Sequence, residues 1–340
     1  MKVLILGGTR FIGSYVTNQL VEQGYDVYLF HRGQTNLNIP GEVHHIYGDR
    51  KDIGRYRLQF EKIQPDVVLD MFPFTEEDAQ HVVNVFSHIT NRLVAISSAD
   101  VYLAFGNLIG LENEELEKTP ITEDSPLRKT LYPYRAQINE GDMMYHYDKI
   151  LVENVYRENP FVPTTILRLP MVHGPLDRQY RPFPYLKRMI DGRPHIVLDK
   201  EVAKWVTCRG YVENVAHAIV LAITNEQAAN QTYNVSDNVY MTEEEWVKEI
   251  QKAYEKWDGS IIVDESGSIS PTGMNPKQPI YMSSEKIRKE IGFKEIISFE
   301  EGLKRTIDWI LNNPPEIHYE KEYEIEDEII ENRKRSGDIL

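Results

Sequence analysis

The 340-residue chain is 41% hydrophobic, which is enough to build the core of one large α/β domain or of two smaller units. Its 53 acidic side chains outnumber 38 basic ones, and the formal net charge of -15 with no visible basic patch argues against a nucleic-acid partner. The single cysteine, Cys208, excludes an internal disulfide and fits a reducing compartment.

A strand-like run begins at Lys2, and no apolar run approaches the length that a membrane span needs. We therefore expect a cytoplasmic protein with no membrane partner. The first half then alternates short apolar runs with helical stretches, and the runs are KVLIL, DVYLF, HHIYG, PDVVLD, RLVAIS and TTILRL. Such strands are typical of a parallel sheet covered on both faces, so we predict a doubly wound α/β fold.

A glycine-rich turn, LILGGTRFIG, separates the first strand from the first helix. In this position, backbone N–H groups and the helix dipole can hold a pyrophosphate, and the alternative is a purely structural turn. Within a βαβ unit the turn indicates a Rossmann-type dinucleotide site. The residues that we assign to the cofactor here are Gly7, Thr9, Arg10, Phe11, Ile12 and Gly13.

Arginines stand where an NAD site commonly has a glycine and an acidic residue. Arg10 replaces the middle glycine, and the second strand ends in His31 and Arg32. Because two guanidinium groups can bracket a 2′-phosphate that a carboxylate would repel, we predict NADP as the cofactor, with NAD as the alternative. Solvated surface arginines are the competing interpretation.

The later part of the chain has shorter elements. We expect residues 1–170 to form the dinucleotide-binding domain and residues 171–315 to form mainly a smaller substrate-binding domain, some of whose elements return to the first sheet. The polar stretch 103–140 is too long for an ordinary connection and is predicted to be an active-site insertion or lid. The Glu-rich residues 316–340 are expected to form an acidic tail that is frayed or docked on a partner.

A tyrosine and a lysine at i and i+4 mark the predicted catalytic site. On a helix, this spacing lets an ammonium lower the pKa of a phenol, which can then exchange the proton of a substrate hydroxyl. Tyr145 and Lys149 have the spacing, as do Tyr47 and Lys51 by chance. We favour the former because Tyr145 lies on a predicted helix before the sixth strand and Ser98 ends the fifth strand, where ligands of such sheets bind.

Five segments in the same order resemble the extended short-chain dehydrogenase/reductases, also called the NAD-dependent epimerase/dehydratase family. They are GGTRFIG, SSADVY, the Tyr145 and Lys149 pair followed by ILVEN, LRLPMVHGP and RGYVENVAHAI. The resemblance implies that Tyr145 is the acid/base, that Lys149 lowers its pKa and binds the ribose, and that Ser98 hydrogen-bonds the substrate oxygen. It also implies a homodimer.

The resemblance extends to further ligand contacts. It implies that Asp49 lies near the adenine, and we also assign Arg50, Met71, Pro170 and Val172 to the cofactor site. On the substrate side it implies that Arg209 faces the substrate, a diphosphate being one possibility. Tyr102 either closes over the substrate or packs as a strand-end aromatic, and both interpretations stay open.

We therefore expect an oxidoreductase or isomerase acting on a secondary alcohol or ketone, most simply of a nucleotide-linked sugar. Epimerisation, dehydration and reduction share the first step and stay open. The alternatives are a reductase of a non-sugar metabolite and an inactive dinucleotide-binding regulatory or RNA-associated protein. The last is raised by GGTRFIG, GDRKD, SSADVYL and a GRP segment, which also resemble a divergent branch of chloroplast RNA-binding proteins lacking the tyrosine.

Overall fold

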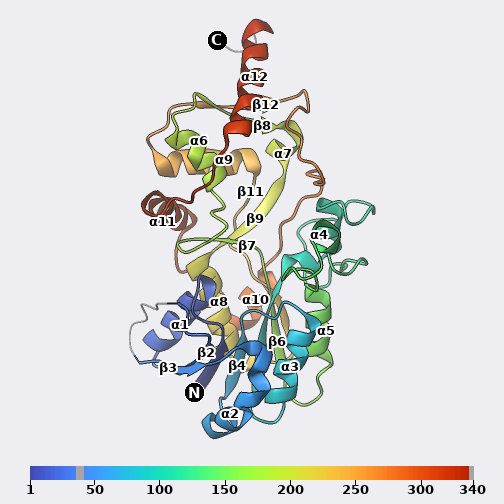
Figure 1. Ribbon diagram of the computed structural model, residues 1–340, viewed down its shortest axis with the longest axis vertical. Helices are drawn as coiled ribbons and strands as arrows, with labels where there is room; N and C mark the ends of the chain where they lie inside the picture. Colours follow the sequence, from blue (N-terminus) through green and yellow to red (C-terminus); the bar gives the residue numbers. More distant parts are fainter. Residues whose placement is uncertain (36–41, 337–340) are drawn as a thin grey trace.

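The computed structural model describes residues 1–35 and 42–336. Figure 1 shows two parts arranged along the long axis of the molecule. A large sheet with helices on both faces lies at the N-terminal end, and a smaller region of short strands and helices lies above it. Within the described residues, none of the helices is long and apolar enough to cross a membrane.

A seven-stranded parallel sheet forms the larger part. Its strands are β1 (Lys2–Leu6), β2 (Asp26–His31), β3 (His44–Tyr47), β4 (Val67–Asp70), β5 (Arg92–Ser98), β6 (Thr164–Leu169) and β10 (Thr232–Asn234). They lie in the order β10-β6-β5-β4-β1-β2-β3, and every neighbouring pair is parallel. The predicted doubly wound sheet is confirmed. The strand order reverses between β1 and β4, which is where such sheets bind ligands.

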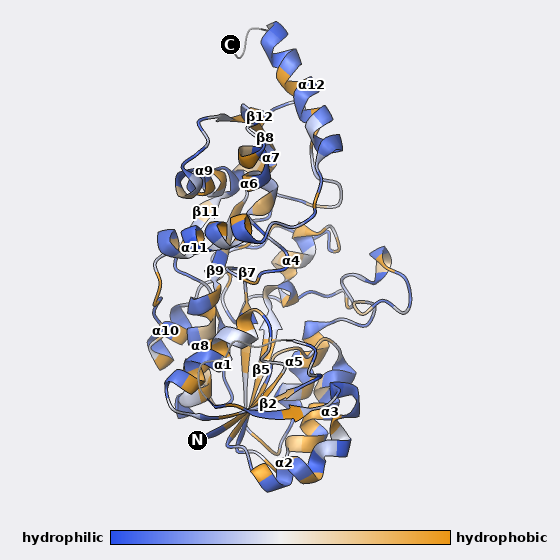
Figure 2. Cartoon of the chain, turned by 60° about the vertical axis from the view of Figure 1, so that its left-hand side comes forward, coloured by the Kyte–Doolittle hydropathy of each residue, from blue (hydrophilic) through white to orange (hydrophobic). Residues whose placement is uncertain are grey.

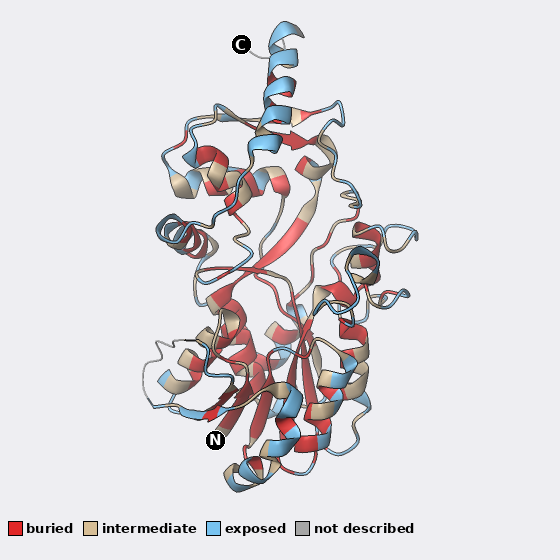
Figure 3. Cartoon of the chain, in the orientation of Figure 1, coloured by how far each residue is buried: buried red, intermediate tan, exposed pale blue. Residues whose placement is uncertain are grey.

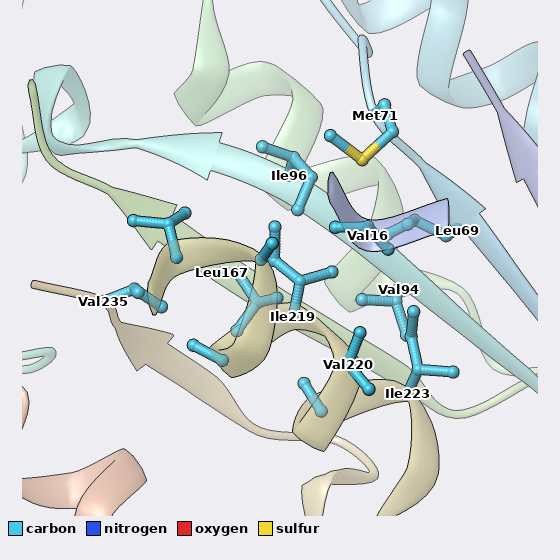
Figure 4. Close-up of a cluster of buried hydrophobic side chains, with 14 of the residues drawn as sticks. Val16, Leu69, Met71, Val94, Ile96, Leu167, Ile219, Val220, Ile223 and Val235 are labelled. Atoms are coloured by element: carbon cyan, nitrogen blue, oxygen red, sulfur yellow. The ribbon is translucent and has the colours of Figure 1, made fainter. Parts of the chain in front are cut away.

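Helices cover both faces of this sheet, as its apolar strands require. One face carries α1 (Ile12–Glu22), α8 (Val212–Thr224) and α10 (Glu285–Ile291). The other carries α2 (Arg57–Ile63), α3 (Glu76–Phe86) and α5 (Lys149–Glu158). Figure 4 shows the first core, in which Val16 and Ile219 join Val94 of the sheet. Each fully buried Val, Leu or Ile side chain stabilises the fold by about 1.5–3 kcal/mol. This packing fixes the position of the strand ends that carry the site.

The smaller part is built on two short sheets. One contains β7 (Met171–His173), β9 (Val206–Tyr211) and β11 (Tyr240–Thr242), and the other pairs β8 (His195–Asp199) with β12 (Ser260–Asp264). The helices packed on them are α6 (Phe183–Ile190), α7 (Lys200–Lys204), α9 (Glu243–Tyr254) and α11 (Phe299–Asn312). Hydrophobic and hydrophilic residues alternate along these helices in Figure 2. Their buried side chains enclose a separate core around Trp246 and Leu303.

Two helices of this part begin with a capping-box sequence, Thr242 with Glu245 and Ser298 with Glu301. At α9, Thr242 accepts from the Glu245 N–H, and Glu245 accepts from the Thr242 N–H in return. At α11, Ser298 accepts from the Glu301 N–H, but the Glu301 carboxylate pairs with Arg305. The first box is thus complete, whereas only the serine half of the second is formed.

The C-terminal segment differs from the expected acidic tail. Residues Glu320–Ser336 form helix α12, which projects beyond the smaller part in Figure 1 and is largely exposed in Figure 3. Ile329 and Ile330 are nevertheless buried against Val197 and Ile262 of the two-stranded sheet. The helix therefore docks within the chain through an apolar face that the dense glutamates conceal in the sequence.

The insertion 103–140 is anchored rather than free. It begins with α4 (Leu103–Leu108), after the short 3-10 turn η2 (Ala99–Val101), and contains a second one, η3 (Arg135–Gln137). Leu127 forms a β-bridge with Tyr102, and Ile121 forms one with Met282. These contacts carry the insertion back to the carboxyl end of β5.

Candidate active site at the carboxyl ends of the strands

The glycine turn after β1 leaves the start of α1 open. Gly7 and Gly8 have φ angles of 112° and 67°, which side-chain-bearing residues rarely adopt. A Cβ on Gly13 would lie 2.9 Å from the Gly8 Cα, so only glycine allows this close approach. No side chain caps α1, and its first turn holds no acidic residue. Open amides beside a glycine cradle fit the pyrophosphate of a dinucleotide.

The Arg10 side chain turns towards the end of β2. Its Nε donates to Thr35 Oγ1 at 3.1 Å, four residues beyond His31, and Arg32 is exposed in the same connection. His31 is held by His45, with 2.8 Å between Nε2 and Nδ1. Arg10 and the end of β2 thus border the same loop, as the interpretation of a phosphate-binding pair requires.

The residues after β3 have roles inside the protein. Asp49 caps the 3-10 helix η1 (Arg50–Tyr56) by accepting from the Lys51 N–H. The Arg50 guanidinium binds both oxygens of Asp70 at 2.9 Å and also pairs with Asp78. We assigned Arg50 to the cofactor, but the structure commits its guanidinium to an internal ion-pair network.

Three further residues of the predicted cofactor site are wholly or partly buried. Met71 is buried directly behind the turn, since its Cβ lies 3.1 Å from where a Gly7 Cβ would be. Val172 is buried in the core beside α8, and Pro170 packs against Gly210.

Helix α5 begins later than the sequence suggests. Lys149 is its first residue, because the Asp148 carboxylate caps it by accepting from the Ile150 N–H at 2.8 Å. Tyr145 therefore lies in the preceding turn and not on the helix, so the predicted i and i+4 geometry is wrong. Its ring packs on Arg135, 4.9 Å from the guanidinium carbon, and on His146.

A different tyrosine reaches the end of β5. The Tyr147 hydroxyl donates to Asp100 Oδ2 at 2.5 Å, and the nearby Ser98 hydroxyl acts to lower its pKa. Lys149 Nζ is 5.8 Å from the centre of the Tyr147 ring. Sequence analysis missed Tyr147 because it stands two residues before the lysine. The only sequence signal for Tyr147 was the Tyr-His-Tyr run at 145–147, in which either tyrosine could be the acid/base.

Lys149 is held in a fixed, buried position. Its ammonium donates to the backbone carbonyls of Pro73 and Ile96, at 2.8 and 2.9 Å. Burial lowers its pKa from 10.5 to about 8, although the Asp100 and Asp70 carboxylates oppose the shift. The structure thus brings Ser98 and Lys149 together as predicted.

The insertion supplies two residues to this cluster that the sequence did not indicate. Arg128 donates to the Asp100 carbonyl oxygen and pairs with Asp148 at 3.3 Å, and both side chains are fully buried. The Tyr134 phenol faces the Asp100 carboxyl. The segment that we predicted to be an active-site insertion or a lid therefore supplies buried residues beside Asp100, as an insertion would.

Two of the three predicted substrate residues, Tyr102 and Arg209, are committed to contacts inside the protein. Tyr102 is completely buried, donating to Asn234 and accepting from Arg168, which supports the packing interpretation. Arg209 is buried in the smaller part, where it pairs with Glu243 at 2.6 Å and stacks on Trp246. It lines a small cavity together with His173, Thr207 and Asp237.

The strand order, the open glycine turn and the polar cluster after β5 define a dinucleotide-binding protein of the Rossmann class. Residues 3–236 match the model of the NAD dependent epimerase/dehydratase family, and the chain belongs to this family. The resemblance inferred from the sequence is confirmed.

Individual relatives are distant. The chain is 25% identical to the chloroplast stem-loop binding protein of 41 kDa b of Arabidopsis thaliana, over 89% of this chain and 77% of the relative. It is 22% identical to the dTDP-glucose 4,6-dehydratase of Salmonella typhimurium, over 92% and 93%. A solved dTDP-glucose 4,6-dehydratase of Streptomyces venezuelae with NAD bound has a TM-score of 0.67 at 19% identity, covering 92% of this chain and 98% of that one.

Proposed function

We propose that the chain oxidises or reduces a secondary alcohol or ketone of a nucleotide-linked sugar, using a bound nicotinamide dinucleotide. The observation that carries the proposal is the cluster of Ser98, Tyr147 and Lys149 at the end of β5, on the same sheet edge as the open glycine turn. The named activity of the dTDP-glucose 4,6-dehydratase relatives supports the sugar substrate.

The cofactor supplies the hydride acceptor or donor, and the chain must handle the hydroxyl proton. Ser98 is half exposed at the strand end and can hydrogen-bond the substrate oxygen. The Lys149 ammonium lies 5.8 Å from the centre of the Tyr147 ring, and the resemblance assigns this lysine to the ribose. The resemblance assigns proton exchange to Tyr145, two residues from the phenol that contacts Asp100.

We also propose NADP as the preferred cofactor. Arg10 and Arg32 border the loop after β2, where the 2′-phosphate of a dinucleotide bound on the glycine turn would lie. The solved relatives with bound NAD make NAD the alternative. A cytoplasmic homodimer, as the resemblance implies, completes the proposal, and light scattering of the purified protein tests the dimer.

The activity is tested on protein purified under native conditions. Mass spectrometry identifies any retained cofactor, and a panel of nucleotide sugars is then followed by nicotinamide absorbance and by NMR of the products. We expect conversion of at least one nucleotide sugar, and loss of conversion in Lys149→Met, the matched control. No conversion of any panel member with cofactor bound would overturn the proposal, and conversion of non-sugar ketones alone would redirect it to the reductase alternative.

A second candidate is an RNA-associated protein without turnover. The similarity to the chloroplast stem-loop binding protein favours it, whereas the net charge of -15 opposes it. Filter binding with a stem-loop RNA at low and physiological salt separates the two. We expect no retained RNA at physiological salt, and submicromolar binding there would support this candidate.

A further inference from the structure

The phenol of Tyr147 occupies the centre of a buried polar cluster. Its hydroxyl donates to Asp100 Oδ2 at 2.5 Å, and the Ser98 hydroxyl lies near enough to lower its pKa. Ser98 is partly exposed, whereas Tyr147 and Asp100 are 6% and 4% exposed. The phenol therefore neighbours both a serine that a substrate can reach and a buried carboxylate.

The Asp100 carboxylate has one oxygen without a hydrogen-bond donor among the described residues, so it can accept a proton. Its Oδ1 is buried, and no described residue hydrogen-bonds it within normal geometry. The residue is otherwise well fixed, because its carbonyl accepts from Arg128 and its N–H donates to Ser98 Oγ at 3.3 Å. A buried carboxylate with an unused oxygen is costly to keep as a purely structural group.

Tyr145 lacks these contacts. Its ring is covered by Arg135, and its backbone carbonyl accepts from the Arg135 Nε at 3.2 Å. The sequence spacing that singles out Tyr145 relies on a helical turn that the Asp148 cap prevents.

We propose that Tyr147, and not Tyr145, exchanges a proton with the substrate hydroxyl, and that Asp100 takes the proton of Tyr147 in the same step. The proposal rests on the proposed function and names the residues that carry out its proton transfer. Tyr147 is the catalytic residue, and Asp100 acts through it.

The step balances for alcohol oxidation. The substrate C–H bond breaks with transfer of a hydride to the nicotinamide, so the alcohol carbon is oxidised and the cofactor is reduced. The substrate O–H proton passes to Tyr147 Oη while the original phenol proton passes to Asp100 Oδ2. The products are a ketone, a neutral phenol and a neutral Asp100, and ketone reduction runs each transfer in reverse.

The charges around the pair favour a relay over a free phenolate. Burial raises the pKa of Tyr147 well above 10, and the Asp100 carboxylate raises it further. Burial also raises the pKa of Asp100, opposed by Tyr147, Arg128 and Lys149 and supported by Asp148. Tyr134 is the remaining titratable group that faces the pair. Because its pKa is raised, the phenol stays protonated and is not available as a phenolate base. It can instead pass its proton to the Asp100 carboxylate, whose own pKa is also raised.

Paired tyrosine variants test which phenol reacts. We expect Tyr147→Phe to lose at least a hundredfold in kcat with cofactor Kd unchanged, and Tyr145→Phe to stay within threefold of the wild type. The reverse pattern in an active enzyme overturns the inference while leaving the proposed function intact. A wild type that converts no substrate overturns the proposed function itself.

Two further measurements test the relay, and the first needs only the wild type. A proton inventory in H2O/D2O mixtures is expected to curve, because two protons move together, and a straight line contradicts the relay. The short phenol-carboxylate hydrogen bond is expected to give a downfield proton NMR resonance in the cofactor-free protein. This resonance should vanish in Tyr147→Phe, move upfield in Asp100→Asn, whose neutral amide is a weaker acceptor, and persist in Tyr145→Phe, and an unshifted resonance in Asp100→Asn contradicts the pairing.

Asp100→Asn distinguishes proton transfer from mere positioning. Asparagine keeps the size and accepts the phenol hydrogen bond, but it cannot take up the proton. We expect at least a tenfold loss of kcat, KM within threefold of the wild type, and a straightened proton inventory. Wild-type kcat with an unchanged inventory would overturn the role of Asp100.

Discussion

Lys149 combines complete burial with an ammonium whose hydrogen bonds go to two backbone carbonyls. Burial lowers the pKa of this ammonium to about 8, so it begins to lose its charge just above neutral pH. We therefore expect the proposed activity to depend on the protonation of this residue.

The first prediction concerns this pH range. As pH rises through about 8, Lys149 loses its proton, so we expect turnover and cofactor affinity to fall together by pH 9. Profiles of kcat/KM and of cofactor Kd from pH 6 to 9.5 provide the check. In Lys149→Met both profiles should be low and flat over this range, and a wild-type profile that stays level to pH 9.5 would exclude the charged lysine as the active form.

The second prediction concerns cofactor choice at Arg10 and Arg32. Loss of a charge-assisted hydrogen bond to a phosphate costs roughly 1.5–3 kcal/mol, so Arg10→Ala and Arg32→Ala should each weaken NADP binding about tenfold or more. Affinity for NAD, which has no 2′-phosphate, serves as the internal control and should change less than threefold. Fluorescence titration measures both Kd values, and equal losses for the two cofactors would remove the basis for an NADP preference.

At the scale of elements, the start of α5 decides the shape of the site. The buried Asp148 carboxylate accepts from the Ile150 and Tyr132 N–H groups and from Arg128. One side chain thus caps the helix, ties the insertion to it and neutralises a buried guanidinium. This arrangement also determines that Tyr147 and not Tyr145 faces Lys149.

The third prediction follows from these contacts. Asp148→Ala removes the cap and leaves Arg128 buried without its carboxylate, so we expect a loss of about 3 kcal/mol or more in the free energy of unfolding. Urea unfolding followed by circular dichroism measures it. Asp124→Ala, at an exposed position of the same insertion, should cost less than about 0.5 kcal/mol, and similar losses in both variants would contradict the anchoring role.

Helix α12 gives the fourth prediction. Ending the chain at Tyr319 removes buried Ile329 and Ile330 and leaves Arg188 without Glu326, its partner in a buried ion pair. We expect the truncation to lower the unfolding free energy by about 3 kcal/mol or more. Glu328→Ala, at an exposed position of the same helix, is the control and should leave stability within about 0.5 kcal/mol, and an equally mild effect of the truncation would show that α12 does not dock.

At the scale of the whole molecule, burial of charge and of titratable groups makes stability depend on pH. His173 lies inside the smaller part, 1% exposed, where its imidazole contacts Thr306. Burial lowers its pKa from 6.5 to about 3, helped by the Arg209 and Arg181 cations. The folded state therefore holds this histidine neutral in a range where the unfolded chain protonates it.

The fifth prediction is a loss of stability in mild acid. Between pH 6.5 and about 3 the unfolded state binds the extra proton, so His173 contributes a slope of up to roughly 1.4 kcal/mol per pH unit, with stability falling as pH falls. Urea unfolding at pH 7 and at pH 5 measures it. His173→Gln should lower stability at pH 7 but show a smaller drop between the two pH values, and an equal drop in both proteins would assign the acid sensitivity to other groups.

The sequence by itself determined the main sheet, the glycine turn and most helix starts. These features are set by short-range physics: apolar runs make buried strands, Gly7 and Gly13 permit conformations that other residues resist, and Thr242 caps the helix that follows it. Ser98 and Lys149 could also be predicted from local sequence, because Ser98 ends strand β5 and Lys149 begins helix α5.

Only the tertiary structure decided the rest. Whether Tyr145 or Tyr147 faces the site depends on a cap tied to Arg128, 20 residues away in the chain, and Arg209 is bound by Glu243, 34 residues away. The docking of α12 on Val197 and Ile262 is equally remote in sequence. Contacts of this kind follow from packing of the whole chain and leave no local pattern, so a spacing such as Tyr-x-x-x-Lys predicts the class of site but not which phenol occupies it.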